Sequence, residues 1–117
     1  MRLSVPAFIA LLSFGTNALA AECYGGSGGY PCATVAAARS ALGSYCANHF
    51  GATCTDFIHY NNPGGEVWIG HIGPFSTAAE CYYAGDEILR KCYGHNDGGY
   101  WTRNKKHLNL NYCKWKK

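Results

Sequence analysis

The chain has 117 residues, which is enough for one domain. Apolar residues make up 48% and charged residues 15%, with a formal net charge of +3, and this composition excludes a disordered or nucleic-acid-coating polymer. Seven cysteines in so short a chain indicate a disulfide framework rather than a cytosolic enzyme, and no apolar run is long enough to cross a bilayer.

The N-terminal segment has the pattern of a secretory signal peptide. Arg2 supplies a positive charge, residues 5–12 form a short apolar core, and residues 18–20 carry small side chains at the two positions that a signal peptidase reads. All seven cysteines follow this segment, which fits an oxidising compartment. We therefore predict a signal peptide over residues 1–20, a single cysteine-rich domain over residues 21–117, and a secreted, extracellular protein.

The next part of the chain predicts a loop and a helix. Residues 22–31 are too rich in glycine for a helix or a regular strand, and we interpret them as a loop held at its ends by Cys23 and Cys32. Residues 34–50 follow, with apolar side chains at helical spacing and a stop signal at Gly51. The recurring residues are Val35, Ala38, Leu42, Tyr45 and Cys46.

A hairpin and a second helix are expected in the middle of the chain. Residues 53–60 and 66–72 are rich in β-branched and aromatic side chains, and the Asn-Asn-Pro-Gly-Gly sequence between them turns the chain. Thr77 and Glu80 then have the spacing of a capping box, which predicts that residues 78–93 form the second helix.

The C-terminal part predicts another pair of strands. Residues 96–99 are typical of a turn, residues 100–103 predict a third strand, and residues 104–106 predict a second turn. Residues 107–113 predict a fourth, half-buried strand, because apolar side chains alternate there with asparagines.

This order of elements predicts an α+β fold. We expect a small disulfide-stapled sandwich in which two helices pack on one face of an antiparallel sheet of about four strands. A domain of this size buries about 60–65% of its unfolded surface, so we expect disulfides to stabilise its core.

One group of residues offers the chemistry of a hydrolase. A secreted ribonuclease would pair a histidine with a glutamate as base and acid, and His59, Glu66 and His71 supply these types, with both histidines able to face each other across the hairpin. The spacing matches no ribonuclease motif, and histidines that are hydrogen-bonded or exposed are the more common explanation. We therefore predict no catalytic residue, no metal and no cofactor, and keep the hydrolase as an alternative.

Aromatic residues suggest a binding site instead. A flat ring covers the apolar face of a sugar while nearby polar groups bind its hydroxyls. Tyr100 and Trp101 follow a glycine-rich turn, and Trp115 lies near the end of the chain. We predict these three as binding residues, with core packing as the alternative for Tyr100, Trp101 and also Trp68.

The last fifteen residues contain six basic side chains and no acidic one. We add Arg103, Lys105 and Lys106 to the predicted binding set, because a basic end that carries Trp115 can contact an anionic membrane or wall polymer. A solvated tail is the more common explanation, and nucleic acid is not the expected partner.

Four features resemble small secreted cysteine-rich proteins of fungi. They are the glycine-rich stretch at residues 23–29, Cys81 and Cys92 on the second predicted helix, Gly-Gly-Tyr-Trp at residues 98–101, and Leu-Asn-Leu-Asn-Tyr-Cys at residues 108–113. Together they resemble the smut-fungus virally encoded killer toxin family and the ink-cap mushroom glycan-binding protein family. The resemblance implies a compact α/β sandwich and a secreted toxin, effector or lectin.

Helix geometry predicts one disulfide. Cys81 and Cys92 are about three turns apart and face the same side of the second predicted helix. If the two helices run antiparallel, the start of the second lies beside Cys46 near the end of the first, which predicts a Cys46–Cys81 bond. Cys92 then lies beside the glycine-rich loop, where its partner is either Cys23 or Cys32.

The resemblance to the killer toxins, applied to the order of the cysteines, favours Cys23–Cys92. Cys54 in the first predicted strand is then expected to bond Cys113 in the last predicted strand. Because seven cysteines leave one without an intrachain partner, Cys32 remains as a free thiol or as the link of a disulfide-bonded dimer.

We expect a non-enzymatic, secreted fungal effector or toxin-like protein with a role in virulence. It would bind a component of a host or competitor cell surface, with a carbohydrate as the candidate ligand. The alternatives are a ribonuclease-like hydrolase that uses His59 or His71 with Glu66, and a membrane- or channel-directed antimicrobial protein that acts through the basic C-terminal tail.

Overall fold

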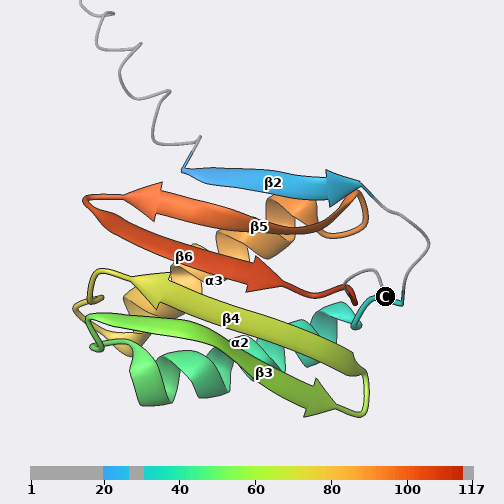
Figure 1. Ribbon diagram of the computed structural model, residues 1–117, viewed down its shortest axis with the longest axis horizontal. Helices are drawn as coiled ribbons and strands as arrows, with labels where there is room; N and C mark the ends of the chain where they lie inside the picture. Colours follow the sequence, from blue (N-terminus) through green and yellow to red (C-terminus); the bar gives the residue numbers. More distant parts are fainter. Residues whose placement is uncertain (1–19, 27–30, 115–117) are drawn as a thin grey trace, which may run out of the picture.

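In the computed structural model, which describes residues 20–26 and 31–114, a five-stranded antiparallel sheet has two helices on one face (Figure 1). The sheet order is β2-β5-β6-β4-β3. The elements are β2 (Ala21–Gly26), α2 (Val35–His49), β3 (Cys54–Asn62), β4 (Gly65–Ile72), α3 (Ala78–Cys92), β5 (Asn96–Arg103) and β6 (Lys106–Asn111). The α+β prediction with both helices on one face is confirmed.

The predicted signal peptide lies outside the described residues except for its last position. Ala20 is buried, and its carbonyl accepts a hydrogen bond from the Thr102 N–H (3.0 Å). Neither helix of the described segments is long and apolar enough to cross a membrane.

The sheet has five strands instead of about four because the glycine-rich segment begins with a strand. Residues 21–26 pair with β5 as the edge strand β2, with Ala21 opposite Trp101 and Cys23 opposite Gly99. Ala21 is buried and Glu22 is exposed, the alternation of a half-buried strand. The prediction of a loop from residue 22 was therefore wrong, because the number of glycines concealed a short alternating pattern.

Strand β5 begins at Asn96, so the predicted turn over residues 96–99 was also wrong. Its two glycines serve close strand packing: a Cβ atom at Gly98 would lie 2.4 Å from the Leu110 carbonyl oxygen, and one at Gly99 would lie 2.4 Å from the Glu22 carbonyl oxygen. Any side chain at these positions would collide with the neighbouring backbone, which is a use of glycine that composition does not distinguish from a turn.

Both helices begin where the sequence predicted, because threonine caps them. The Thr34 hydroxyl oxygen accepts a hydrogen bond from the Ala37 N–H, and the Thr77 hydroxyl oxygen accepts one from the Glu80 N–H (both 3.0 Å). The Glu80 carboxylate reaches back to accept from the Ser76 N–H (2.7 Å), one residue before the cap.

The hydrophobic core lies between the helices and the sheet. On β4, Val67 and Ile69 are buried against the helices while Trp68 between them is partly exposed, as the two-residue period of a strand requires. The largest fully buried side chains are Tyr45, Tyr112, Leu42, Ile69, Ile88, Leu89, Leu108 and Leu110.

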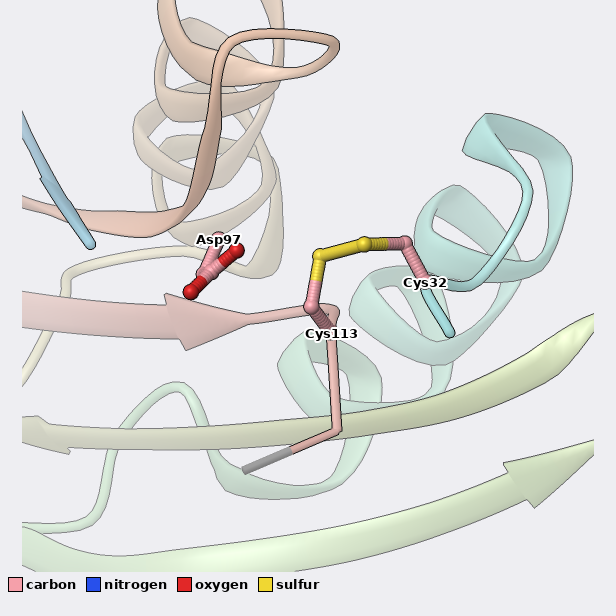
Figure 2. A group of neighbouring side chains, drawn as sticks. All are labelled: Cys32, Asp97 and Cys113. Carbon is pink, nitrogen blue, oxygen red and sulfur yellow. A yellow bond between two sulfur atoms is a disulfide. The ribbon is translucent and has the colours of Figure 1, made fainter. Parts of the chain in front are cut away.

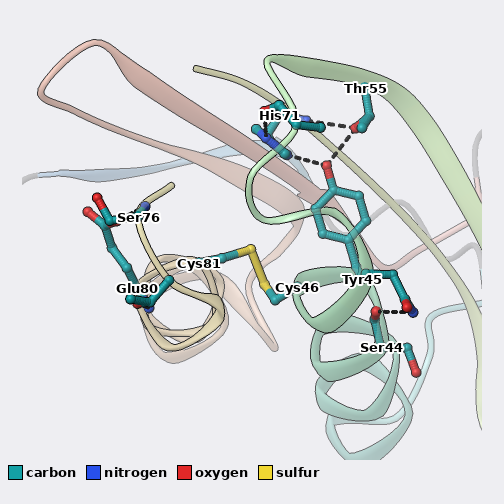
Figure 3. The surroundings of a disulfide bond; sticks show 11 residues. Ser44, Tyr45, Cys46, Thr55, His71, Ser76, Glu80 and Cys81 are labelled. Atoms are coloured by element: carbon teal, nitrogen blue, oxygen red, sulfur yellow. Dashed lines mark hydrogen bonds between the residues drawn. A yellow bond between two sulfur atoms is a disulfide. The ribbon is translucent and has the colours of Figure 1, made fainter. Parts of the chain in front are cut away.

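Two disulfides hold α3 at its two ends. Cys46–Cys81 joins the start of α3 to the end of α2 (Figure 3), and Cys23–Cys92 joins its last residue to β2. The Cα–Cα distances are 5.6 and 5.5 Å. Both bonds agree with the pairing expected from the sequence. Cys46–Cys81 joins the end of α2 to the start of α3, as the expected antiparallel arrangement of the two helices requires.

The third disulfide is Cys32–Cys113 (Figure 2), so the predicted Cys54–Cys113 bond was wrong. Strands β3 and β6 are both antiparallel to β4 and run in the same direction, which places Cys54 at the start of β3 and Cys113 beyond the far end of β6. Cys32 instead lies directly opposite Cys113 in an antiparallel bridge. The free, exposed cysteine is Cys54, so Cys32 has no thiol with which to link a dimer.

We expect Cys54→Ser to remove the one titratable thiol and to leave the free energy of unfolding within about 0.5 kcal/mol of the wild type. In the double variant Cys46→Ala/Cys81→Ala the free energy of unfolding should fall by about 2–5 kcal/mol, because the bond between the helices constrains the unfolded chain. Thiol titration and urea unfolding measure both effects. A thiol that still titrates in Cys54→Ser would contradict the observed pairing.

We expect Gly85→Ala in α3 to destabilise the fold by about 1–3 kcal/mol although alanine favours helices. A Cβ atom there would lie 2.4 Å from a methyl carbon of Leu42, which is fully buried and has no room to move. Gly43→Ala in α2 is the matched control, since its Cβ would have no neighbour within 4 Å, and it should stabilise by about 0.5–1 kcal/mol. Urea unfolding compares the two, and a stabilised Gly85→Ala variant would refute the close helix contact.

Candidate functional site

The face of the sheet opposite α2 and α3, here called the outer face, carries no helix in the described ranges (Figure 1). The residues that alternate with the core positions therefore point outward on every strand. Cross-strand pairing aligns Glu22 with Tyr100, Tyr100 with Asn109, and Asn109 with Gly70. These four residues form a line across four adjacent strands, which we call the central row.

The central row ends at β3 in a bulge. The pairing of β3 with β4 shifts between Thr55 and Ile58, and this irregularity exposes two consecutive residues, Asp56 and Phe57. Beside it lies a cleft of about 210 Å³. Its lining residues are Thr55, Asp56, Phe57, Gly70, His71, Ile72, His107 and Asn109.

Glycine forms the floor of this cleft. A Cβ atom at Gly70 would lie 3.1 Å from the carbonyl oxygens of Thr55 and Asp56, so a larger residue would press on the bulge and fill the space. The walls are apolar: Phe57 is 44% exposed and Ile72 is 60% exposed. The cleft is thus a shallow site with hydrophobic sides.

Several polar side chains at the cleft and along the central row have no polar partner among the described residues. The side chains of Glu22, Asp56, Tyr100 and Asn109 form no hydrogen bond or ion pair with any residue in the described ranges. At the cleft, the Nδ1 atom of His107 bonds the Thr102 hydroxyl (3.1 Å). The outer face therefore presents amide, carboxylate and hydroxyl groups that are available to a ligand.

The two histidines of the alternative hydrolase hypothesis do not come together. His59 lies opposite Trp68 on the exposed face of β3, whereas His71 lies opposite Thr55 and is buried. The two histidines therefore do not face each other across the hairpin, and this part of the ribonuclease hypothesis was wrong. His59 and His71 belong to different residue pairs of the hairpin, and several pairs of the two strands lie between them.

His59 and Glu66 do form a pair, and the Glu66 carboxylate is also bound by Lys114. The His59 Nε2 atom lies 2.8 Å from one Glu66 carboxylate oxygen, and the Lys114 ammonium lies 3.4 Å from the other. Partial loss of water raises the pKa of Glu66, but the bonds to Lys114 and His59 outweigh this and leave the pKa below its usual value. The His59 ring also stacks on Trp68 at 4.8 Å.

His71 serves the structure of the bulge (Figure 3). Its Nε2–H donates to the Ala52 carbonyl (2.8 Å), and its Nδ1 atom bonds the Tyr45 hydroxyl, which also bonds the Thr55 hydroxyl. Burial raises the pKa of Tyr45 to about 12, so the phenol remains a donor near neutral pH. This network fixes Thr55 immediately before the two exposed residues of the cleft.

The predicted binding residues have different environments. Tyr100 is 39% exposed on the outer face, and its ring lies 6.4 Å from that of Tyr24 at an interplanar angle of 20°. Trp101 is only 2% exposed and its indole N–H donates to the Glu87 carboxylate (2.7 Å), so its ring is a core element that offers no face to a sugar. The alternative of core packing holds for Trp101.

The basic residues of the predicted set lie at the tip of the β5–β6 hairpin. Arg103 lies over the Trp101 ring at 5.7 Å, and Lys105 is exposed in a turn with a positive φ of 66°. Lys106 is bound to the Glu80 carboxylate (2.7 Å) and covers the Phe75 ring. Trp115 and the end of the basic tail lie outside the described residues.

One group of side chains has the spacing of a metal site. Cys32, Asp97 and Cys113 each offer a ligand atom, and these atoms lie within 4.8 Å of one another (Figure 2). The two sulfur atoms are bonded to each other in the third disulfide, so neither is a thiolate. With the disulfide formed, these three residues are a covalent cross-link with the Asp97 carboxylate beside it.

Fold and outer face together define a small disulfide-bonded α+β domain that presents aromatic, amide and carboxylate side chains on one side of a sheet. Residues 33–116 match the family model of the alpha-galactosyl binding lectins, and because this match spans most of the chain, the protein belongs to that family. No curated protein matches the sequence. The family supports the resemblance to the mushroom glycan-binding proteins, while the resemblance to killer toxins stays a prediction.

Sequence reasoning missed most of the cleft. Asn109 was assigned to a half-buried strand, and the alternation of Leu108 and Leu110 around it already indicated that it points away from the core. No comparable signal marked Asp56 and Phe57, because the bulge that exposes both depends on pairing with β4.

We expect Glu80→Gln to lower stability at neutral pH by about 0.5–1 kcal/mol and to flatten its acid dependence. Bonds from Lys106 and from the Ser76 N–H hold the pKa of the Glu80 carboxyl below its usual 4.5. Stability from a lowered pKa is present above the unfolded-state value and is lost as the pH falls through the folded-state value. Urea unfolding at pH 7 and pH 3 measures this, with Glu22→Gln as the control, and an unchanged acid dependence would contradict it.

Proposed function

We propose that this protein binds a terminal α-galactosyl residue of a glycan in the cleft between β3, β4 and β6. Membership in the alpha-galactosyl binding lectin family supports the class of ligand. The observation that carries the location is the combination of unpartnered polar groups with exposed apolar walls. Asn109 and Asp56 supply the polar groups, and Phe57 and Ile72 supply the walls.

The chemistry of the cleft fits a sugar ring. One face of galactose is a patch of C–H groups, which can pack on the Phe57 ring, while its hydroxyls both donate and accept hydrogen bonds. The Asn109 amide offers two donors and an acceptor, and the Asp56 carboxylate offers acceptors. The volume of about 210 Å³ lies below the usual range for drug-sized ligands and suits a single ring.

Such binding is an equilibrium contact and needs no catalytic group, so we propose a non-enzymatic role. We further propose that residues 1–20 export the domain and that it binds glycans on a host or competitor cell surface as an effector or toxin-like protein. Three disulfides are compatible with an extracellular protein, and they support this part of the proposal.

We expect Asn109→Ala and Phe57→Ala each to weaken binding of methyl α-galactoside by about threefold to tenfold, because one removes hydrogen bonds and the other removes the apolar wall. Isothermal titration calorimetry measures the dissociation constants.

The matched control is Asn48→Ala, which removes an exposed amide from α2, on the other side of the sheet. It should bind like the wild type. Thermal unfolding should show that all three variants remain folded. The proposal fails if the folded wild type binds no α-galactoside, or if Asn109→Ala and Asn48→Ala bind equally well.

A further inference from the structure

The polar and aromatic groups of the outer face do not end at the cleft. We propose that the site continues along the central row over Tyr100 to Glu22, and that it binds an uncharged oligosaccharide of at least three sugar units. This inference rests on the proposed function, since it takes the cleft as the place of the terminal sugar. Glu22 and Tyr24 lie outside residues 33–116, so this extension goes beyond the part of the chain that the family model matches.

The length of the row fits a sugar chain. Register pairing runs from Glu22 through Tyr100 and Asn109 to Gly70, and the bulged strand β3 follows. Neighbouring strands lie about 4.8 Å apart, so five strands span roughly 19 Å. One sugar unit advances a chain by about one strand spacing, so a trisaccharide whose first unit lies over β4 in the cleft places its third unit over Tyr100 on β5, beside Glu22 on the edge strand.

The Tyr100 ring is positioned to contact the third unit. Its ring is nearly parallel to that of Tyr24, whose hydroxyl donates to the Leu110 carbonyl oxygen across the sheet (3.5 Å). A Cβ atom at Gly98 would lie 3.1 Å from that hydroxyl, so the glycine lets Tyr24 lie across the face. Burial and the nearby Asp97 charge raise the pKa of Tyr24 to about 12, which keeps this hydroxyl protonated.

Charge selects the kind of oligosaccharide. Carboxylates lie at both ends of the row, Glu22 on β2 and Asp56 on β3, and neither forms an ion pair with a residue of segments 20–26 and 31–114. The Lys114 ammonium on the same side is bound to Glu66. An acidic sugar beside Glu22 would meet like charge, and the residues that the structure describes offer no compensating cation there, whereas the hydroxyls of a neutral sugar can donate to both carboxylates.

Calorimetry with three ligands tests this inference. They are methyl α-galactoside, a linear neutral trisaccharide that ends in α-galactose, and the same trisaccharide with a uronic acid as its third unit. We expect the wild type to bind the neutral trisaccharide about threefold to tenfold more tightly than the monosaccharide, because its third ring packs on Tyr100. The uronic acid should remove this gain, and Glu22→Gln should restore it.

Tyr100→Ala should lose the gain and keep the wild-type affinity for methyl α-galactoside, and Tyr100→Phe should keep both. Tyr83→Ala is the matched control, because Tyr83 is an exposed tyrosine on α3, away from the outer face. It should bind all three ligands like the wild type.

The possible failures are distinguishable. If the wild type binds the monosaccharide and the trisaccharide equally well, the extension is wrong and the proposed function stands. If a folded Tyr100→Ala variant loses both ligands equally, Tyr100 belongs to the terminal site and the extension is likewise wrong. If the folded wild type binds neither, the proposed function fails and this inference fails with it.

Discussion

The fixed position of α3 is the constraint on which the rest of the structure depends. Its first turn is bonded to α2 through Cys46–Cys81, and its last residue is bonded to β2 through Cys23–Cys92. A domain of this size has a small core, and these bonds hold the helix layer against the sheet where hydrophobic packing alone would give little stability. Contact between Gly85 and Leu42 then brings the two helices together.

Because both helices cover one face of the sheet, the core uses only the side chains on that face. Each strand has one set of positions committed to the core, and the alternate set faces outward whatever its chemistry. In this protein that second set includes Tyr100, Asn109 and the residues of the β3 bulge, few of which the core needs. Stability and recognition are therefore encoded in the same strands but on opposite faces, which explains how a domain this small can carry a binding surface.

The elements with strong local signals were predictable from the sequence, and the contacts between distant segments were not. Helix α3 begins after Thr77, whose capping box the sequence identifies, and Cys46–Cys81 follows from helix periodicity with the two helices antiparallel. By contrast, the pairing of Cys32 with Cys113 depends on the relative direction of strands that are distant along the chain. The burial of Trp101 and the assignment of Gly98 to a strand depend equally on which strands become neighbours.

The bulge in β3 changes the phase of that strand. Thr55 and Ile58 both face the helices although two residues lie between them, where a regular strand has one. The two intervening residues therefore belong to neither register. Losing or gaining one residue at this point would rebuild a wall of the cleft and leave the core positions on either side in place. A single-residue insertion or deletion is thus a route by which related proteins can diversify their ligand preference without redesigning the fold.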